Sequence, residues 1–100
     1  MDSDEVITTL RRHEAELRAL GVERITVFGS MATDTGTEES DVDVAVRLAP
    51  ELYGLERVGA LTDVRARLSE LLHCPVDVVE EPARSPHIRH AIERDGLRAF

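Results

Sequence analysis

The chain has 100 residues, 42% of them hydrophobic and 32% charged, and this size and balance predict one globular domain spanning residues 1–100. The formal net charge at pH 7 is −8, so direct nucleic-acid binding, which requires a basic surface, is not expected. All 12 basic residues are arginine, and the absence of lysine excludes both a P-loop and a lysine nucleophile.

The sequence also bears on where the protein works. No apolar run approaches the roughly 20 residues that a membrane-spanning helix needs. The segment from Asp2 to Glu5 is acidic where a signal peptide would be basic. Cys74 is the single cysteine, which excludes an internal disulfide. These features predict a cytoplasmic location and no membrane partner.

The first third of the chain predicts a helix followed by a strand. Asp2 or Ser3 can cap the helix, and Gly21 stands where a glycine commonly follows a helix end. A short run over residues 24–28 predicts a strand that ends abruptly at Gly29. The helical stripe is made of Val6, Leu10, His13, Leu17 and Leu20.

The rest of the chain alternates strands and helices. Residues 31–40 predict a helical turn followed by a loop, because small, threonine and acidic residues are mixed there. Alternation and helical spacing predict the later elements, with Ser85 and Pro86 opening the last helix. The order of elements indicates an α/β fold with helices packed against a small sheet. The expected elements are a strand over 41–48, a helix over 50–72, a strand over 75–79, a helix over 86–95 and an edge strand over 97–100.

Gly29 and Ser30 form the first candidate for binding chemistry. Glycine permits close backbone approach after a strand, and the free N–H groups of a following helix start suit phosphate oxygens. Taken alone, the pair is also typical of an ordinary turn that binds nothing.

Asp41 and Asp43 form the second candidate. Side chains alternate along a strand, so both carboxylates point to one face, about 7 Å apart, while Val42 and Val44 point to the other. Such a pair can converge on one or two cations, or it can simply line a solvated strand face. A calcium loop is excluded because Val-Ala-Val follows Asp43.

Asp77 is the third candidate, since it interrupts the apolar run over residues 75–79. In a buried strand such a carboxylate must be paired, hydrogen-bonded or bound to a metal. On an edge strand it could instead face water. The segment alone leaves both interpretations open.

Taken together, the Gly29-Ser30 pair, the ten-residue spacing to Asp41-x-Asp43, and Asp77 on a later strand resemble the nucleotidyltransferase superfamily of DNA polymerase β. The length and opening helix look most like the minimal nucleotidyltransferases, the MNT or MntA-type antitoxins encoded beside HEPN toxins. This resemblance covers nearly the whole chain and implies a palm-like α+β fold with a small mixed sheet flanked by helices. Met31-Ala32-Thr33 departs from the family pattern, because many members carry arginines there.

The resemblance implies a reaction and a set of roles. Asp41, Asp43 and Asp77 would be the catalytic residues and the ligands of two Mg²⁺ ions, and Gly29 and Ser30 would bind the triphosphate of ATP. The expected reaction is transfer of AMP from ATP to a tyrosine hydroxyl of a cognate HEPN ribonuclease toxin. The chain would then act as an antitoxin and form a hetero-oligomer with that toxin.

Three alternatives stay open at this point. The chain could be an antitoxin subunit that neutralises its toxin by binding alone, an interpretation that Met31 favours. It could be a nucleotidyltransferase for a small molecule that works through a partner subunit. His73-Cys74 with His87 and His90 could imitate a zinc site, although their spacing fits no zinc finger and solvated histidines are the simpler interpretation.

Overall fold

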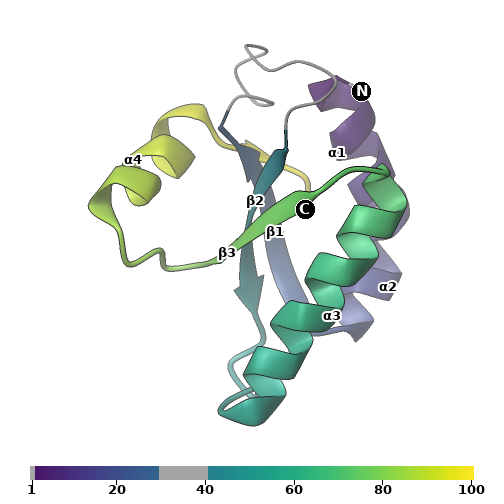
Figure 1. Ribbon diagram of the computed structural model, residues 1–100, viewed down its shortest axis with the longest axis vertical. Coiled ribbons are helices and arrows are strands. Elements are labelled where there is room, and N and C mark those ends of the chain that lie inside the picture. The colour runs from purple at the N-terminus through teal and green to yellow at the C-terminus, as the bar shows by residue number, and fades with distance from the viewer. Residues whose placement is uncertain (1, 30–40) are drawn as a thin grey trace.

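The computed structural model describes residues 2–29 and 41–100, in which helices pack around a small sheet (Figure 1). None of the described helices combines the length and apolar character needed to cross a bilayer. The elements are α1 (Ser3–Arg12), α2 (Glu14–Ala19), β1 (Val22–Phe28), β2 (Val42–Leu48), α3 (Leu55–Leu72), β3 (Val76–Glu80), α4 (Pro86–Asp95) and β4 (Leu97–Arg98).

The four described strands form one mixed sheet in the order β3-β2-β1-β4. β1 runs antiparallel to both β2 and β4, while β2 and β3 run parallel and are joined by α3. Consequently the carboxyl end of β1 lies at the same end of the sheet as the amino ends of β2 and β3. This end is uppermost in Figure 1. The predicted small mixed sheet flanked by helices is confirmed.

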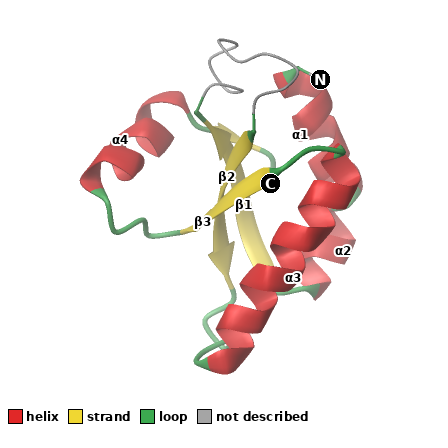
Figure 2. Ribbon diagram, viewed as in Figure 1, coloured by secondary structure: helices red, strands yellow, loops and turns green. Residues whose placement is uncertain are grey.

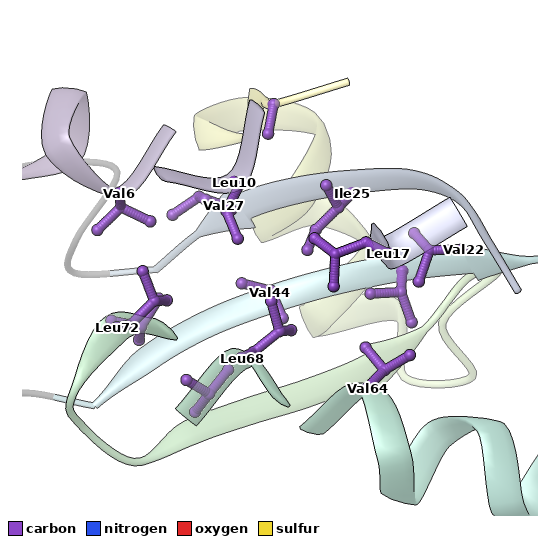
Figure 3. Packing of buried hydrophobic residues seen from close by; sticks show 14 of the residues in the cluster. Val6, Leu10, Leu17, Val22, Ile25, Val27, Val44, Val64, Leu68 and Leu72 are labelled. Carbon is purple, nitrogen blue, oxygen red and sulfur yellow. The ribbon is translucent and has the colours of Figure 1, made fainter. Parts of the chain in front are cut away.

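Helices cover the two faces of the sheet unequally. Figure 2 shows α1, α2 and α3 on one side and α4 on the other. The main core lies between the sheet and the first three helices (Figure 3). β2 contributes Val42, Val44, Val46 and Leu48 to this core, each at most 2% exposed, which confirms the face predicted from the alternation. Asp43 therefore points to the α4 side.

The first helix differs from its prediction because it is interrupted. The Asp2 carboxylate caps α1 by accepting a 2.8 Å hydrogen bond from the Glu5 N–H, as the sequence predicts. The chain then leaves helical geometry at His13, whose ring nitrogen bonds the Thr9 carbonyl at 2.9 Å. α2 resumes at Glu14, and Leu10 and Leu17, which are seven residues apart, both pack in the core.

Two further boundaries were predicted wrongly. The strand predicted from residue 24 already begins at Val22, which is 1% exposed and packs in the core. The helix predicted from residue 50 begins only at Leu55, because Gly54 has φ +62° and ends the preceding loop in a conformation that a helix cannot contain. The turn predicted for residues 31–40 lies outside the described residues.

Candidate functional site

Gly29 ends β1 at the upper end of the sheet, and its backbone leaves no room for a side chain. Its φ of +76° lies in the left-handed region that favours glycine. A Cβ atom built there would lie 2.4 Å from the Asp43 Oδ2 atom and 3.3 Å from its carboxyl carbon. The backbone at Gly29 therefore lies directly against the Asp43 carboxylate. Ser30, the other predicted phosphate ligand, lies outside the described residues, as does the segment 31–33.

Asp43 and Asp77 are brought together by the parallel pairing of β2 and β3. The two residues are register partners, and adjacent strands lie about 4.8 Å apart. Their side chains thus project from the same face of the sheet, the face opposite the valine core. Asp41 lies just before β2, two residues from Asp43 and hence on the same side. The geometry required by the sequence-based hypothesis, Asp77 beside Asp43 rather than across the sheet, is present.

The electrostatics of Asp43 reflect this crowding. Partial burial raises the pKa of Asp43, and the negative charges of Asp77 and then Asp41 raise the pKa further. A carboxylate whose ionised form is disfavoured by two neighbouring carboxylates has a strong preference for a nearby cation. The three predicted acidic residues therefore act on one another electrically, with Asp43 at the centre.

The carboxylates do not form a ready-made chelate in the described part of the chain. Within residues 2–29 and 41–100, no three His, Cys, Asp or Glu side chains lie close enough together to form a metal site. Two carboxylates 4 Å apart repel by roughly 4 kcal/mol at an effective dielectric near 20, so bringing all three together requires a cation. The donor set still fits Mg²⁺, which takes oxygen ligands and commonly uses one or two carboxylates.

The environment of Asp77 decides between its two interpretations. β3 is an edge strand, and the Asp77 side chain is exposed. Of the two interpretations that the sequence left open, the edge-strand aspartate facing water is the one found, while the adjacent Val76 packs in the core. Exposure at an edge does not separate Asp77 from Asp43, however. It leaves this carboxylate accessible to an incoming substrate.

Two residues beside the carboxylates were not selected from the sequence as site residues. Phe28 is the register partner of Asp43 on the other flank, and it is only 4% exposed. Its position directly before Gly29 was the sequence feature that could have identified Phe28 as a neighbour of the site. Cys74 is partly buried, and burial together with the charge of Asp41 raises the pKa of its thiol. Cys74 is therefore held as the neutral thiol and is unsuited to act as a nucleophile.

The histidines do not join this site. His73, His87 and His90 are all exposed, and no described cluster of His, Cys and acidic residues could hold zinc. Glu80, at the other end of β3, is paired with Arg57. The candidate site in the described residues thus consists of Gly29, Asp41, Asp43 and Asp77.

Comparison with known proteins is consistent with this arrangement. The chain matches the nucleotidyltransferase domain family over residues 10–98. A Methanocaldococcus jannaschii protein, provisionally named a protein adenylyltransferase, is 34% identical in a 93-residue alignment that covers 91% of each chain.

Two solved structures share the fold. One described as a minimal nucleotidyltransferase has a TM-score of 0.68 at 27% identity, covering 97% of this chain and 95% of the other. The second is a chain from the tri-AMPylated Shewanella oneidensis HEPN toxin in complex with MNT antitoxin. It has a TM-score of 0.62 at 21% identity, covering 94% of this chain and 71% of that chain. At this identity the second likeness concerns the fold alone.

Proposed function

Because the chain belongs to the nucleotidyltransferase domain family, we propose that it transfers AMP from ATP to a tyrosine hydroxyl of a HEPN-type toxin and thereby neutralises that toxin. Membership of the family makes the chain an enzyme that transfers nucleotides. Protein as the acceptor is supported by the adenylyltransferase name of its relative. A toxin as the acceptor is supported by the structural neighbour that accompanies an AMPylated toxin.

The observation that carries the proposal is the register of Asp43 with Asp77, beside the close backbone approach of Gly29. In the proposal, Asp41, Asp43 and Asp77 hold two Mg²⁺ ions against the phosphates of ATP. When bound, such ions activate the attacking hydroxyl and neutralise the charge that develops on the departing pyrophosphate. An acidic chain can hold a triphosphate in this way because the metal ions supply the positive charge.

The residues of the chain have distinct roles in this proposal. Gly29 and Ser30 bind the β- and γ-phosphates, and the glycine keeps backbone N–H groups within reach of the oxygens. The exposure of Asp77 on the edge strand supports a role for it on the side from which a protein acceptor would approach. It accepts or directs the proton of the tyrosine hydroxyl. Asp43, whose pKa is raised by both neighbours, depends most on the cations.

Mg²⁺ is expected to raise the thermal stability of the wild-type protein. A ligand that binds only the folded state stabilises it by about 1.4 kcal/mol at ten times its dissociation constant. That corresponds to a Tm increase of about 6–11 °C for a domain of this size. The Asp41→Ala, Asp43→Ala double variant should show no such shift in differential scanning fluorimetry.

Asp63→Ala is the matched control for this measurement, because Asp63 is an exposed aspartate on α3 outside the site. It should respond to Mg²⁺ as the wild type does. Equal Mg²⁺ shifts in the wild type and the double variant would remove the case for this metal site.

The proposed reaction is tested by incubating the chain with a purified HEPN-type toxin, ATP and Mg²⁺, followed by intact-mass measurement. The toxin should gain the mass of one or more AMP units, and peptide mapping should locate them on tyrosine. A toxin that binds the chain and loses its ribonuclease activity without any gain in mass would contradict the proposal.

The second candidate function, an antitoxin that acts by binding alone, is favoured by Met31-Ala32-Thr33 in place of arginines. The two functions differ in how they depend on the carboxylates. In cells that express the toxin, an Asp43→Asn variant should fail to restore growth if transfer of AMP is required. Full rescue by this variant would support neutralisation by binding.

A further inference from the structure

Large apolar side chains are exposed together at the start of α3. Tyr53, Leu55 and Val58 are 77%, 89% and 60% exposed, and they account for three of the four exposed large hydrophobic residues in the described part of the chain. We refer to these three residues as the α3 patch. Leu55 and Val58 are three residues apart on the first turn of the helix, so their side chains share a face.

The α3 patch does not contribute to the core. α3 packs on the sheet through a separate stripe, made of Ala60, Val64, Leu68 and Leu72. A cluster of exposed apolar residues that folding does not require commonly marks a surface for a partner.

The patch is held in shape by Arg57, which lies between its two helical members. The Arg57 guanidinium pairs with Glu80 at the end of β3 and donates hydrogen bonds to the backbone carbonyls of Leu52 and Ala49. These contacts fix the loop that carries Tyr53 to the first turn of α3. A surface that is rigid before binding loses less conformational entropy when a partner docks.

Charge distinguishes between possible partners for the patch. Glu51 and Glu56 are exposed beside it, and the charge of Arg57 is already neutralised by Glu80. The border of the patch is therefore acidic. Two copies of a chain with net charge −8 would repel each other across such a border. The complementary partner presents apolar side chains surrounded by arginine or lysine.

The patch lies far from the candidate active site. Asp43 is near the amino end of β2, whereas the loop carrying Tyr53 follows the carboxyl end of the same strand (Figure 1). The five residue-to-residue steps from Asp43 to Leu48 alone span about 16 Å. A protein bound to the patch would consequently leave the carboxylates open to an acceptor tyrosine.

We propose that the α3 patch is the docking surface for the toxin, which binds there through apolar side chains bordered by basic ones while its tyrosine reaches the distant carboxylates. This proposal rests on the proposed function, because that function supplies the partner. Binding and chemistry are then separate properties of two surfaces on one chain.

The test compares Leu55→Glu, Val58→Glu with Ala15→Glu, Ala19→Glu, which adds the same charge at exposed positions of α2. The probe is a purified HEPN-type toxin, and its affinity for the chain is measured by isothermal titration calorimetry. The patch variant should bind at least about tenfold more weakly than the control variant, since buried apolar anchors dominate interfaces. Its KM for the toxin should rise by a similar factor, while kcat at saturating toxin stays unchanged because the carboxylates are untouched.

A patch variant that binds the toxin as tightly as the α2 control would overturn the proposal. A wild-type dimer that the patch substitutions dissociate, with toxin affinity unchanged, would also overturn it in favour of a second copy as the occupant. Leu55→Ala, Val58→Ala provides a milder variant, and an unchanged Mg²⁺-induced Tm shift verifies that each variant is folded. Failure of the proposed function would give a different result from failure of the docking proposal. The wild type would then bind the toxin through the patch but add no AMP to it.

Discussion

Asp43→Asn is expected to lower kcat for AMP transfer by at least about 10³-fold, because it removes the central carboxylate of the site. Asp43 lies beside Asp77 in register and against the backbone of Gly29. A neutral amide of nearly the same shape keeps the packing but supplies neither the charge nor the second anionic oxygen that a divalent cation requires. The rate of AMP incorporation into toxin at saturating ATP and Mg²⁺ measures the effect. Activity within tenfold of wild type would exclude Asp43 from the chemistry.

The same substitution should stabilise the protein when Mg²⁺ is absent. The pKa of Asp43 is raised in the folded state, so the ionised carboxylate costs folding free energy at pH values above that raised pKa. The cost disappears as the pH falls through the raised pKa and the group becomes protonated. With solvent screening, removing the charge at pH 7 should gain on the order of 0.5 kcal/mol, or about 2–4 °C in Tm. Asp63→Asn, on an exposed helix face, is the control and should show no gain.

A simultaneous loss of activity and gain in stability is a pattern that a purely structural aspartate would not give. A structural carboxylate is held by hydrogen bonds or cationic partners, and replacing it lowers the Tm. Asp43 has instead two anionic neighbours that raise its pKa. A carboxylate at this position lowers the folding stability, and a requirement of the reaction best explains its presence.

Much of the site was predictable because strand periodicity is local. Val42 and Val44 required one face of β2 to be buried, and that placed Asp41 and Asp43 on the other face without any knowledge of the sheet. The end of β1 at Gly29 was predictable from the same kind of local signal. The capping interaction of Asp2 with Glu5 was also visible in the sequence.

The features that sequence could not provide depend on tertiary structure. Nothing local to residues 75–79 reveals that β3 is an edge strand, so the exposure of Asp77 was unpredictable. The register that pairs it with Asp43 joins two strands that are separated in the chain by α3, so neither segment alone reveals it. The break at His13 is likewise not visible in the sequence. Helix periodicity alone favours one continuous helix there.

Gly29→Ala is expected to reduce AMP transfer by about 100-fold, because the substitution strains the backbone and displaces the neighbouring Asp43 carboxylate. The φ of +76° costs a residue other than glycine about 1–2 kcal/mol. In addition, the new Cβ would lie 2.4 Å from the Asp43 Oδ2 atom, so the carboxylate or the backbone must move. A displacement on the order of 1 Å within a catalytic group can reduce the rate by a factor of 10². The measurement is kcat for AMP transfer, together with the Tm of the variant.

Gly54→Ala separates the two effects. Gly54 also has a positive φ, of +62°, but a Cβ atom there would meet nothing within 4 Å. This control should therefore lose at least about 1 kcal/mol of stability from backbone strain while its kcat stays unchanged. If both alanine variants lost activity in proportion to their loss of stability, Gly29 would matter only for folding. A loss of kcat confined to Gly29→Ala would instead establish that the position of the Asp43 carboxylate, and not the stability of the domain, limits the reaction.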